Sequence, residues 1–305
     1  MIMKEIGTVA VLGAGQMGRG IAQVMAAHGL RVRLADTSRD HASKAKDIVA
    51  TQLAKLVERG KMAAAAREEI LGNILPLDLY SNLEDVDFAV EAVTERFDVK
   101  QEIFSALDQR CRPDAVLATN TSSISVTALA ATVVTPARVI GMHFMNPPPL
   151  MKLVEIVRGL ATSDECYAVT QALAERLGKS TIESRDIPGF VVNRILMPML
   201  NEACFTLYEG VANVADIDVA IHLGLNHPMG PFTLMDLIGL DTTLAILQVL
   251  HHEIGDPKYR PCPLLRQYVA AGWLGRKAGR GFYVYENGVQ GAPATTWGAQ
   301  SRERA

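Results

Sequence analysis

Two side chains suited to proton transfer lie in one stretch of the chain, His143 in RVIGMHFMNPPP and Glu155 in MKLVEIV. The prolines at 147–149 exclude a helical connection between them, because proline lacks an amide donor and its ring clashes inside a helix. We therefore expect two antiparallel strands with a reversal near Pro149, which sets His143 opposite Glu155. A buried carboxylate on one imidazole nitrogen fixes the tautomer and leaves the other nitrogen to accept a hydroxyl proton. The alternative is a structural histidine beside an unrelated glutamate.

The run GAGQMG has the G-x-G-x-x-G spacing of a dinucleotide-binding turn. Gly13 permits the tight turn, Gly15 lets a pyrophosphate approach the backbone, and Gly18 lets the next helix pack closely on the strand. The run follows a buried strand pattern and opens a helix whose amino end favours phosphate. Asp36, at the end of the next strand pattern, suits the ribose hydroxyls and repels the extra phosphate of NADP. NAD is therefore the expected cofactor, although the nearby Arg39 weakens the preference.

A second polar group follows a later strand pattern, in the run NTSS at residues 120–123. The carboxyl ends of parallel strands are where α/β sheets bind their ligands. Asn120 and Ser122 are therefore candidates for facing a substrate.

The elements that must position these residues alternate between strand and helix patterns. Apolar runs at 6–12, 31–36, 86–93 and 115–119 are separated by helical patterns, the first at 16–27. This alternation predicts an α/β fold of the Rossmann type, with a doubly wound, mostly parallel sheet.

A helical hairpin is expected to project from this sheet. One helix pattern covers residues 38–59, Gly60 can end it, and KMAAAAREEILGNI begins a second helix. One face of the first helix carries polar residues at three-and-four spacing, namely Lys44, Thr51, Lys55 and Arg59. Taken alone, this face is most simply a solvated surface.

Strand patterns nearly vanish after residues 186–189. We predict an NAD-binding domain at 1–186, an all-helical domain for substrate binding and dimerisation at 187–288, and a loose C-terminal tail at 289–305. The segment FVVNRILMPMLNEACFTLYEG is apolar around most of its circumference and contains Pro198, as a kinked central or interface helix would.

Composition excludes several classes of protein. The 305 residues carry a formal net charge of −3 and lack a basic stripe with aromatic residues, so no nucleic-acid partner is expected. No stretch of eighteen apolar residues lacks a charge, glycine or proline, and the short apolar start does not resemble a secretory signal. The four cysteines are scattered singly, which predicts free thiols in a cytoplasmic protein and no metal site.

Six blocks of the chain resemble the L-3-hydroxyacyl-CoA dehydrogenase family, and most closely its bacterial branch, the 3-hydroxybutyryl-CoA dehydrogenases. They are GAGQMGRGIAQ, NTSSISV, GMHFMNPPPLMKLVEIVRG, PGFVVNRIL, NHPMGPFTLMDLIGLD and GWLGRKAGRGFY, and they keep that family's order across nearly all of residues 6–285. The resemblance implies an NAD-dependent oxidoreductase of short acyl-CoA thioesters in fatty acid or butanoate metabolism, working as a homodimer.

The resemblance also implies roles for individual residues. His143 becomes the general base and Glu155 its orienting partner, while Ser122 and Asn193 hold the 3-oxygen of the substrate. The implied cofactor contacts are Gly13, Gly15, Gln16, Met17, Gly18, Asp36, Glu95, Lys100, Asn120, Ser122, Asn146 and Lys277.

In enzymes of this family the projecting hairpin covers coenzyme A. Lys55 and Arg59 thereby become candidate partners for its phosphates. Met145 and the three prolines at 147–149 depart from some relatives and are expected to reshape the acyl pocket. We expect a stand-alone dehydrogenase, without a fused hydratase domain.

Several alternatives share parts of this pattern. Short-chain dehydrogenases use Tyr-x-x-x-Lys, which this sequence lacks, and the class resembling 6-phosphogluconate dehydrogenase needs a lysine where this chain has Asn193-Arg194. The intact catalytic set disfavours a non-catalytic relative of the kind found in eye lens. A dehydrogenase of a free hydroxy acid, of the gulonate or carnitine type, stays open, and the basic face of the hairpin favours a thioester over it.

Overall fold

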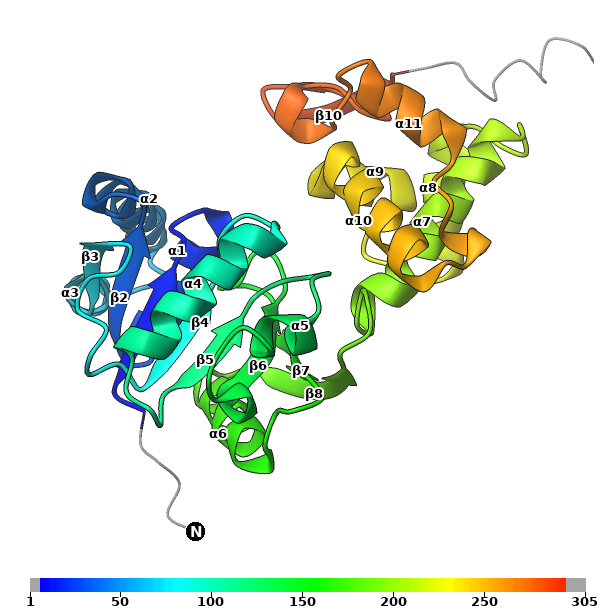
Figure 1. Ribbon diagram of the computed structural model, residues 1–305. Coiled ribbons are helices and arrows are strands. Elements are labelled where there is room, and N and C mark those ends of the chain that lie inside the picture. The colour runs from blue at the N-terminus through cyan, green and yellow to red at the C-terminus, as the bar shows by residue number, and fades with distance from the viewer. Residues whose placement is uncertain (1–5, 295–305) are drawn as a thin grey trace, which may run out of the picture. The chain divides into compact units, whose positions relative to one another are not determined.

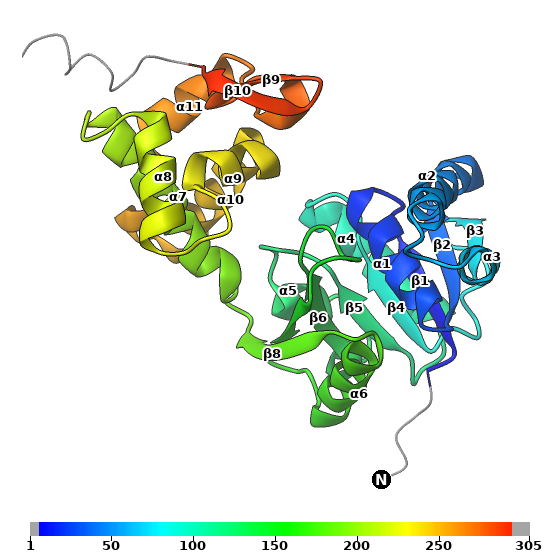
Figure 2. The same cartoon turned by 180° about the vertical axis from the view of Figure 1, so that it is seen from behind.

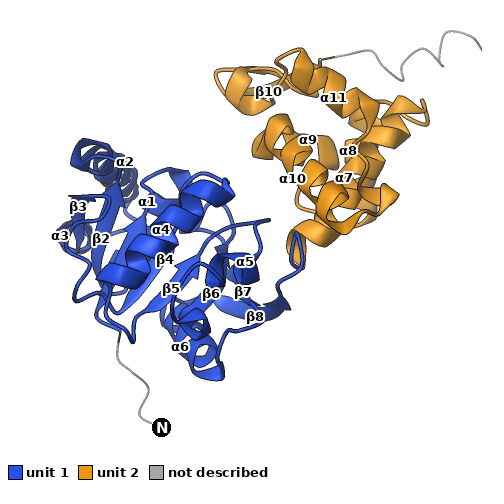
Figure 3. Cartoon of the chain, in the orientation of Figure 1, with its two compact units in different colours: residues 1–190 blue, residues 191–305 orange. Residues whose placement is uncertain are grey.

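The computed structural model describes residues 6–294 of the chain. The chain forms two compact units, residues 1–190 and residues 191–305 (Figure 3). The predicted boundary stood after residue 186, and the division in the structure lies after residue 190.

The first unit is built on an eight-stranded sheet. Its strands are β1 (Thr8–Leu12), β2 (Arg31–Asp36), β3 (Ile74–Asp78), β4 (Phe88–Glu91), β5 (Val116–Thr119), β6 (Val139–Phe144), β7 (Leu153–Arg158) and β8 (Ser180–Arg185). They lie in the order β3-β2-β1-β4-β5-β6-β7-β8, and every neighbouring pair is parallel except β6 with β7. The mostly parallel, doubly wound sheet confirms the predicted fold class.

Helices cover both faces of this sheet. They are α1 (Gln16–Ala27), α2 (Arg39–Glu58), α3 (Ala64–Gly72), α4 (Phe97–Arg110), α5 (Val126–Ala130) and α6 (Asp164–Arg176), with a 3-10 turn, η1 (Pro136–Arg138). Helices α4 and α5 lie on the face turned to the viewer in Figure 1, and α1 and α6 on the face seen in Figure 2. Each face has its own apolar cluster, with Ile21, Val49 and Leu173 in one and Phe104 and Leu129 in the other.

The first strands and helices follow the predicted boundaries closely. Helix α1 and strand β2 cover the predicted 16–27 and 31–36. Helix α2 begins after Ser38, whose hydroxyl accepts the amide of His41 at 3.3 Å, and the chain turns away at Gly60 with φ +66°. The predicted second helix is confirmed only for Ala64–Gly72, because Ile74 already belongs to β3.

Two strands of this sheet were not predicted, and both lie at its edges. Strand β3 contains Pro76, which an edge tolerates because one side of the strand needs no donor. Strand β8 has the polar sequence STIESR, of which only Ser184 is buried. An edge strand with little buried surface lacks the apolar alternation by which strands are predicted.

The second unit is mainly helical. It contains α7 (Val192–Tyr208), α8 (Val214–Gly224), α9 (Pro231–Ile238), α10 (Leu240–Ile254) and α11 (Pro263–Ala270), the 3-10 turns η2 (Pro257–Tyr259) and η3 (Arg276–Ala278), and strands β9 (Tyr283–Glu286) and β10 (Val289–Pro293). These elements enclose an apolar core of their own, with Leu207, Phe232 and Phe282 at its centre. Pro198 lies inside α7, as predicted.

The prediction of a loose tail from residue 289 is wrong for β10, which pairs antiparallel with β9. Asn287 and Gly288 join the two strands with φ of +50° and +77°. Asn-Gly is the favoured two-residue hairpin turn, because both residues adopt positive φ readily. The remainder of the predicted tail, residues 295–305, lies outside the described residues.

All four cysteines are buried free thiols, as predicted. Burial raises the pKa of Cys111 to about 11 and that of Cys166 to about 12. Within residues 6–294 no three His, Cys, Asp or Glu side chains are grouped as a metal site requires. In that same range no single helix is long and apolar enough to span a membrane, although α9 and α10 together reach the required length and composition across a 95° bend.

Candidate active site

The glycine loop joins β1 to α1 in a shape that suits a pyrophosphate. Gly13 has φ +99°, and a Cβ on it would lie 2.6 Å from the carbonyl oxygen of Ala92. A Cβ on Gly18 would lie 1.7 Å from the Gly13 carbonyl oxygen, whereas one on Gly15 would meet nothing within 4 Å. Gly15 caps α1 without a side-chain hydrogen bond, and Met17 anchors the first turn against the core. The open space and the amides at this helix end therefore fit a phosphate group.

Asp36 ends β2 beside this loop. Its Oδ2 accepts the amide of Ala14 at 2.7 Å and its Oδ1 accepts the amide of Thr37 at 2.8 Å. Partial burial acts to raise the pKa of Asp36, but the hydrogen bonds from Ala14 and Thr37 outweigh it and hold the pKa below its usual value. The carboxylate is thus ionised at neutral pH, as a ribose-binding residue of an NAD site must be. The side chain of Arg39 is exposed, and its amide binds Asp78 Oδ1 at 2.7 Å.

His143 and Glu155 face each other directly on the antiparallel strands β6 and β7. The distance from His143 Nδ1 to Glu155 Oε2 is 2.7 Å, and the exposed fractions of the two residues are 8% and 0%. With Nδ1 engaged by a carboxylate, Nε2 is the nitrogen that can exchange a proton with a ligand. The reversal at the prolines thus sets up the pairing that the sequence predicted.

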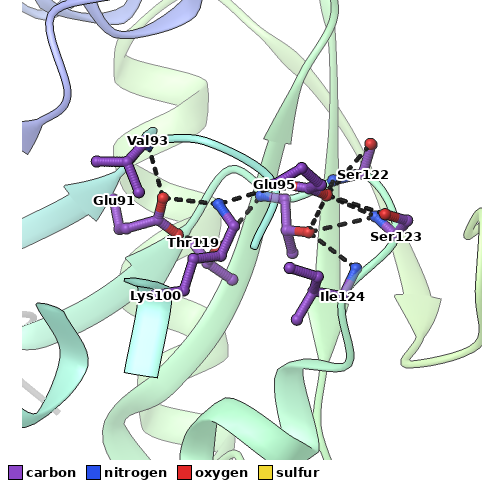
Figure 4. A network of polar contacts seen from close by, with 9 residues as sticks. Glu91, Val93, Glu95, Lys100, Thr119, Ser122, Ser123 and Ile124 are labelled. Atoms are coloured by element: carbon purple, nitrogen blue, oxygen red, sulfur yellow. Dashed lines mark hydrogen bonds and ion pairs between the residues drawn. The ribbon is translucent and has the colours of Figure 1, made fainter. Parts of the chain in front are cut away.

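Ser122 belongs to a loop after β5, residues 120–124, which we call the serine loop. A single oxygen of Glu95, Oε1, accepts the amides of Ser122 and Ser123 at 2.9 and 3.1 Å and the hydroxyl of Thr121 (Figure 4). Burial acts to raise the pKa of Glu95, but the Lys100 ammonium and these hydrogen bonds lower it overall. An ionised Glu95 therefore holds the loop that presents Ser122.

Lys100 is almost entirely enclosed, with 1% of its side chain exposed. Its Nζ lies 2.7 Å from Glu91 Oε1 and 3.2 Å from Glu95 Oε2 (Figure 4). Glu91 was not among the predicted site residues. A glutamate inside the apolar run VDFAVEAV is the signal that marks it, because a buried carboxylate needs partners.

Two amides connect separate parts of the site. Asn120 Oδ1 accepts the amide of Phe144 at 2.9 Å, which joins the serine loop to the residue after His143. Asn146 Oδ1 accepts Gln16 Nε2 at 3.0 Å, which joins the glycine loop to the proline turn, residues 146–151.

The proline turn is also held from two other directions. Lys179 Nζ donates to the carbonyl oxygens of Pro148 and Met151 at 2.7 and 2.8 Å, and burial lowers the pKa of this lysine. Gly20 of α1 lies against the ring of Pro148, where a Cβ would come within 2.9 Å of Pro148 Cδ. Helix α1 and the turn therefore touch directly.

Two further residues near the site were missed by the sequence analysis. The Phe190 ring lies edge-on to the His143 imidazole, with 5.6 Å between ring centroids. Asp186 accepts Ser125 Oγ at 2.7 Å and the amides of Val126 and Thr127 at 2.9 and 2.7 Å, at the start of α5. Glu95 and Asp186 thus hold the serine loop and the residues after it from both ends. Apolar and acidic residues near a domain boundary carry no sequence signal for such roles.

Two of the predicted site residues belong to the second unit. Asn193 lies in the first turn of α7, and Lys277 lies in η3 with its Nζ 2.7 Å from both carboxylate oxygens of Asp241. Their contacts with substrate and cofactor stay predictions.

The basic face of α2 is exposed as predicted. Lys55 and Arg59 are both exposed, and Arg59 caps the carboxyl end of the helix. The neighbouring Gln52 and Leu56 line a cavity of about 280 Å³ that lies between α1, α2 and the proline turn. Its wall includes Gln16, Arg19, Gly20, Gln23 and the prolines at 147–149.

Hydride exchange at a dinucleotide coupled to proton transfer by a carboxylate-bound imidazole is the chemistry of an NAD-dependent dehydrogenase. The family model "3-hydroxyacyl-CoA dehydrogenase, NAD binding domain" matches residues 8–187, and "3-hydroxyacyl-CoA dehydrogenase, C-terminal domain" matches residues 189–285. The chain belongs to the 3-hydroxyacyl-CoA dehydrogenase family.

Individual relatives are similar over nearly their whole lengths. A Bacillus subtilis protein named probable 3-hydroxybutyryl-CoA dehydrogenase is 51% identical over 282 residues, which cover 92% of this chain and 98% of that protein. A Deinococcus radiodurans protein of the same name is 52% identical over 275 residues, 90% of this chain and 99% of its own. The crystal structure of (S)-3-hydroxybutyryl-CoA dehydrogenase from Ralstonia eutropha matches with a TM-score of 0.89 at 48% identity, covering 93% of this chain and 100% of that one.

Proposed function

We propose that this chain interconverts (S)-3-hydroxybutyryl-CoA and acetoacetyl-CoA with NAD as the hydride acceptor. The observation that carries the proposal is the buried His143–Glu155 pair, with 2.7 Å between Nδ1 and Oε2. It stands at the same edge of the sheet as the glycine loop, because β1 and β6 both run parallel to the strands between them. The short acyl chain and its configuration are taken from the names of the similar proteins.

NAD bound at the glycine loop would supply the hydride acceptor. The residues proposed to hold it are Gly13, Gly15, Gln16, Met17, Gly18 and Asp36 for the pyrophosphate and ribose, and Glu95, Lys100, Asn120, Ser122, Asn146 and Lys277 on the nicotinamide side. The open position above Gly15 and the ionised Asp36 support this assignment.

The chain's own residues manage the proton and the 3-oxygen. His143 Nε2 accepts the proton of the 3-hydroxyl as hydride leaves carbon 3, and returns it in the reverse direction. Glu155 keeps the proton on Nδ1 and balances the imidazolium that forms. Ser122 and Asn193 donate hydrogen bonds to the 3-oxygen.

The coenzyme A part of the substrate is assigned to α2. Lys55 and Arg59 offer two positive charges to its phosphates, and exposed side chains can reach a ligand without unfolding anything. A half-open cavity of about 280 Å³, lined by Gln52 and Leu56 among others, lies beside them. A free hydroxy acid would use neither feature.

The second unit is proposed to form a homodimer. Its exposed apolar side chains include Ile195 at 69%, Val219 at 53%, Leu223 at 71% and Leu225 at 61%. Exposed apolar side chains at the start of α7, on α8 and just after α8 support an interface between copies. A cytoplasmic location is proposed from the four free thiols.

The test is a substrate screen on the purified protein. Acetoacetyl-CoA, carnitine and gulonate are compared with both NAD and NADP cofactors, following absorbance of the reduced nicotinamide. We expect fast reduction of acetoacetyl-CoA with NADH and little turnover of the free hydroxy acids. Faster turnover of a free hydroxy acid, or a preference for NADPH of about tenfold, contradicts the proposal.

A further inference from the structure

The groups around Lys100 form a closed ring of hydrogen bonds and one ion pair. Glu91 Oε1 binds Lys100 Nζ, and Lys100 Nζ binds Glu95 Oε2. Glu95 Oε1 then accepts the hydroxyl of Thr121, whose amide binds Thr119 Oγ1 at 3.2 Å. Thr119 Oγ1 closes the ring by donating to Glu91 Oε2 at 2.7 Å.

The strand register explains how this ring closes. Glu91 ends β4 and Thr119 ends β5, and the two residues are direct neighbours in the parallel pair. Lys100 reaches them from the first turns of α4, and the serine loop leaves from β5. The ring therefore ties two strand ends, one helix and the serine loop together, and Figure 4 shows these groups converging.

Burial divides the ring into an inner and an outer part. Glu91 and Thr119 have no exposed surface, and Lys100 and Thr121 expose 1% each. The side chain of Glu95 is 39% exposed. Of the ring members, Glu95 is thus the most exposed, and it connects the buried part of the ring to the serine loop.

We propose that Glu91 is a positioning residue that acts through Lys100 and Glu95. The Glu91 carboxylate fixes the Lys100 ammonium, and that ammonium keeps Glu95 ionised and turned toward the serine loop. The inference deepens the proposed function and rests on it, because Ser122 in that loop is the residue assigned to the 3-oxygen.

The first experiment tests whether Glu91 acts through Lys100 and Glu95. Glu91→Gln and Lys100→Met are each compared with the wild type for kcat and KM with acetoacetyl-CoA and for NADH affinity by fluorescence titration. Both variants should lower kcat by about 10–100-fold, since small displacements of a positioning group cost about that much. The NADH dissociation constant should rise in both variants, and more in Lys100→Met, because Lys100 and Glu95 are proposed to hold the nicotinamide side of the cofactor. A kcat and an NADH dissociation constant that both stay within about threefold of wild type in Glu91→Gln overturn the proposal.

The pH profile gives a readout that a merely structural role would not move. The charged groups facing Glu95 are Lys100 from α4 and, behind it, Glu91 from β4; the nearby Arg96 and Asp98 bind each other. Lys100 is the neighbour that lowers the pKa of Glu95 by its charge. Removal of the Lys100 charge therefore raises the pKa of Glu95. As the pH falls, the activity that needs ionised Glu95 is then lost at a higher pH than in the wild type.

The profile is measured in the direction of acetoacetyl-CoA reduction, in which His143 is the proton donor. The acid limb of kcat should move to higher pH in Lys100→Met. It should not move upward in Glu91→Gln, where the ammonium remains, and Lys100→Arg should restore the wild-type limb. An equal upward shift in Lys100→Met and Glu91→Gln contradicts the proposed order of action.

Hydrogen exchange tests the positioning without any turnover. The amides of Ser122 and Ser123 should exchange about tenfold faster in both variants, while those of β1 stay unchanged. Unchanged exchange at the serine loop overturns the proposal whatever the substrate is. If the wild type does not reduce acetoacetyl-CoA, the proposed function fails, and exchange together with NADH affinity still decides the role of the ring.

A milder substitution in the ring keeps the proposal testable if the charge variants fail to fold. Thr119→Val removes the hydroxyl that closes the ring and keeps all three charges and nearly the same volume. It should lower kcat by about 3–10-fold, the cost of one hydrogen bond, with no pH shift. Thr170→Val is the matched control, because Thr170 is also fully buried and its hydroxyl binds a helix carbonyl at 2.8 Å, away from the ring. A kcat as low in Thr170→Val as in Thr119→Val contradicts the ring as the cause.

Discussion

Two buried pairs in the first unit each join a glutamate to a nitrogen base at the same distance. His143 Nδ1 and Glu155 Oε2 lie 2.7 Å apart, as do Lys100 Nζ and Glu91 Oε1, and both glutamates are 0% exposed. The nitrogen bases differ in chemistry. An imidazole has a second nitrogen and changes charge near neutral pH, whereas an ammonium stays protonated and gives its donors to two carboxylates at once. The same distance therefore serves proton transfer in one pair and fixed geometry in the other.

The surroundings of the two pairs differ in the same sense. The His143 side chain keeps 10% of its surface exposed and lies against the edge of the Phe190 ring. The Lys100 side chain keeps 1%. A group that exchanges protons with a substrate must stay accessible at one point, and a group that holds a fixed charge between two carboxylates need not. The exposure of the nitrogen base, more than the distance within the pair, distinguishes the two roles.

The largest effect is expected from breaking the proton-transfer pair. His143→Ala should lower kcat by about 10²–10⁴-fold, and Glu155→Gln by a comparable factor, because the amide permits the wrong tautomer and carries no charge. NADH affinity should barely change. Steady-state kinetics of the double variant should show little more loss than the worse single variant, since the partners act as one unit. Losses that multiply would mean that Glu155 acts elsewhere.

The next prediction joins the two pairs in one experiment. Glu91→Gln combined with Glu155→Gln should show losses in kcat that multiply, because the ring around Lys100 shares none of its members with the His143 pair. The added loss from Glu91→Gln should be about 10–100-fold in either background. A double-mutant cycle measures the coupling between the two substitutions directly. A ΔΔG‡ of the double variant that differs strongly from the sum of the two single values would mean that the two pairs form one network.

A change remote from both pairs sharpens the comparison further. Lys55→Ala with Arg59→Ala should raise KM for acetoacetyl-CoA by about tenfold and leave kcat nearly unchanged, because a distant phosphate is bound equally in ground and transition states. Lys44→Ala, with the same charge on the same exposed face, is the matched control. An unchanged KM in the double variant would contradict the assignment of coenzyme A to α2.

The smallest effect is expected from changing Phe190, whose aromatic side chain lies beside the His143 imidazole. Phe190→Leu should lower kcat by about 3–10-fold, from the loss of an aromatic contact worth roughly 0.5–1.5 kcal/mol. The rate of His143 modification by diethyl pyrocarbonate, followed by peptide mass analysis, should rise at the same time. An unchanged modification rate would show that Phe190 does not cover the imidazole.

Much of the site could be predicted from local patterns in the sequence. The prolines excluded a helix, so the pairing of His143 with Glu155 followed from strand geometry, and Asp36 followed from its place after the glycine run. Glu91 and its ring were not predicted, because Lys100 lies on a helix and Thr119 on another strand, and only the folded sheet brings them together. The edge strand β8 was missed because an exposed edge needs no apolar pattern.

The proline turn has a thermodynamic consequence for ligand binding. The turn is held by contacts with three residues, Gln16, Gly20 and Lys179, and these contacts form when the protein folds. The turn is therefore already ordered when a ligand binds. A residue whose backbone is ordered only on binding subtracts roughly 1–2 kcal/mol from the affinity, close to a tenfold weakening. Preorganisation of this turn moves that entropic cost from the binding equilibrium to the folding equilibrium, where it is shared with the whole domain.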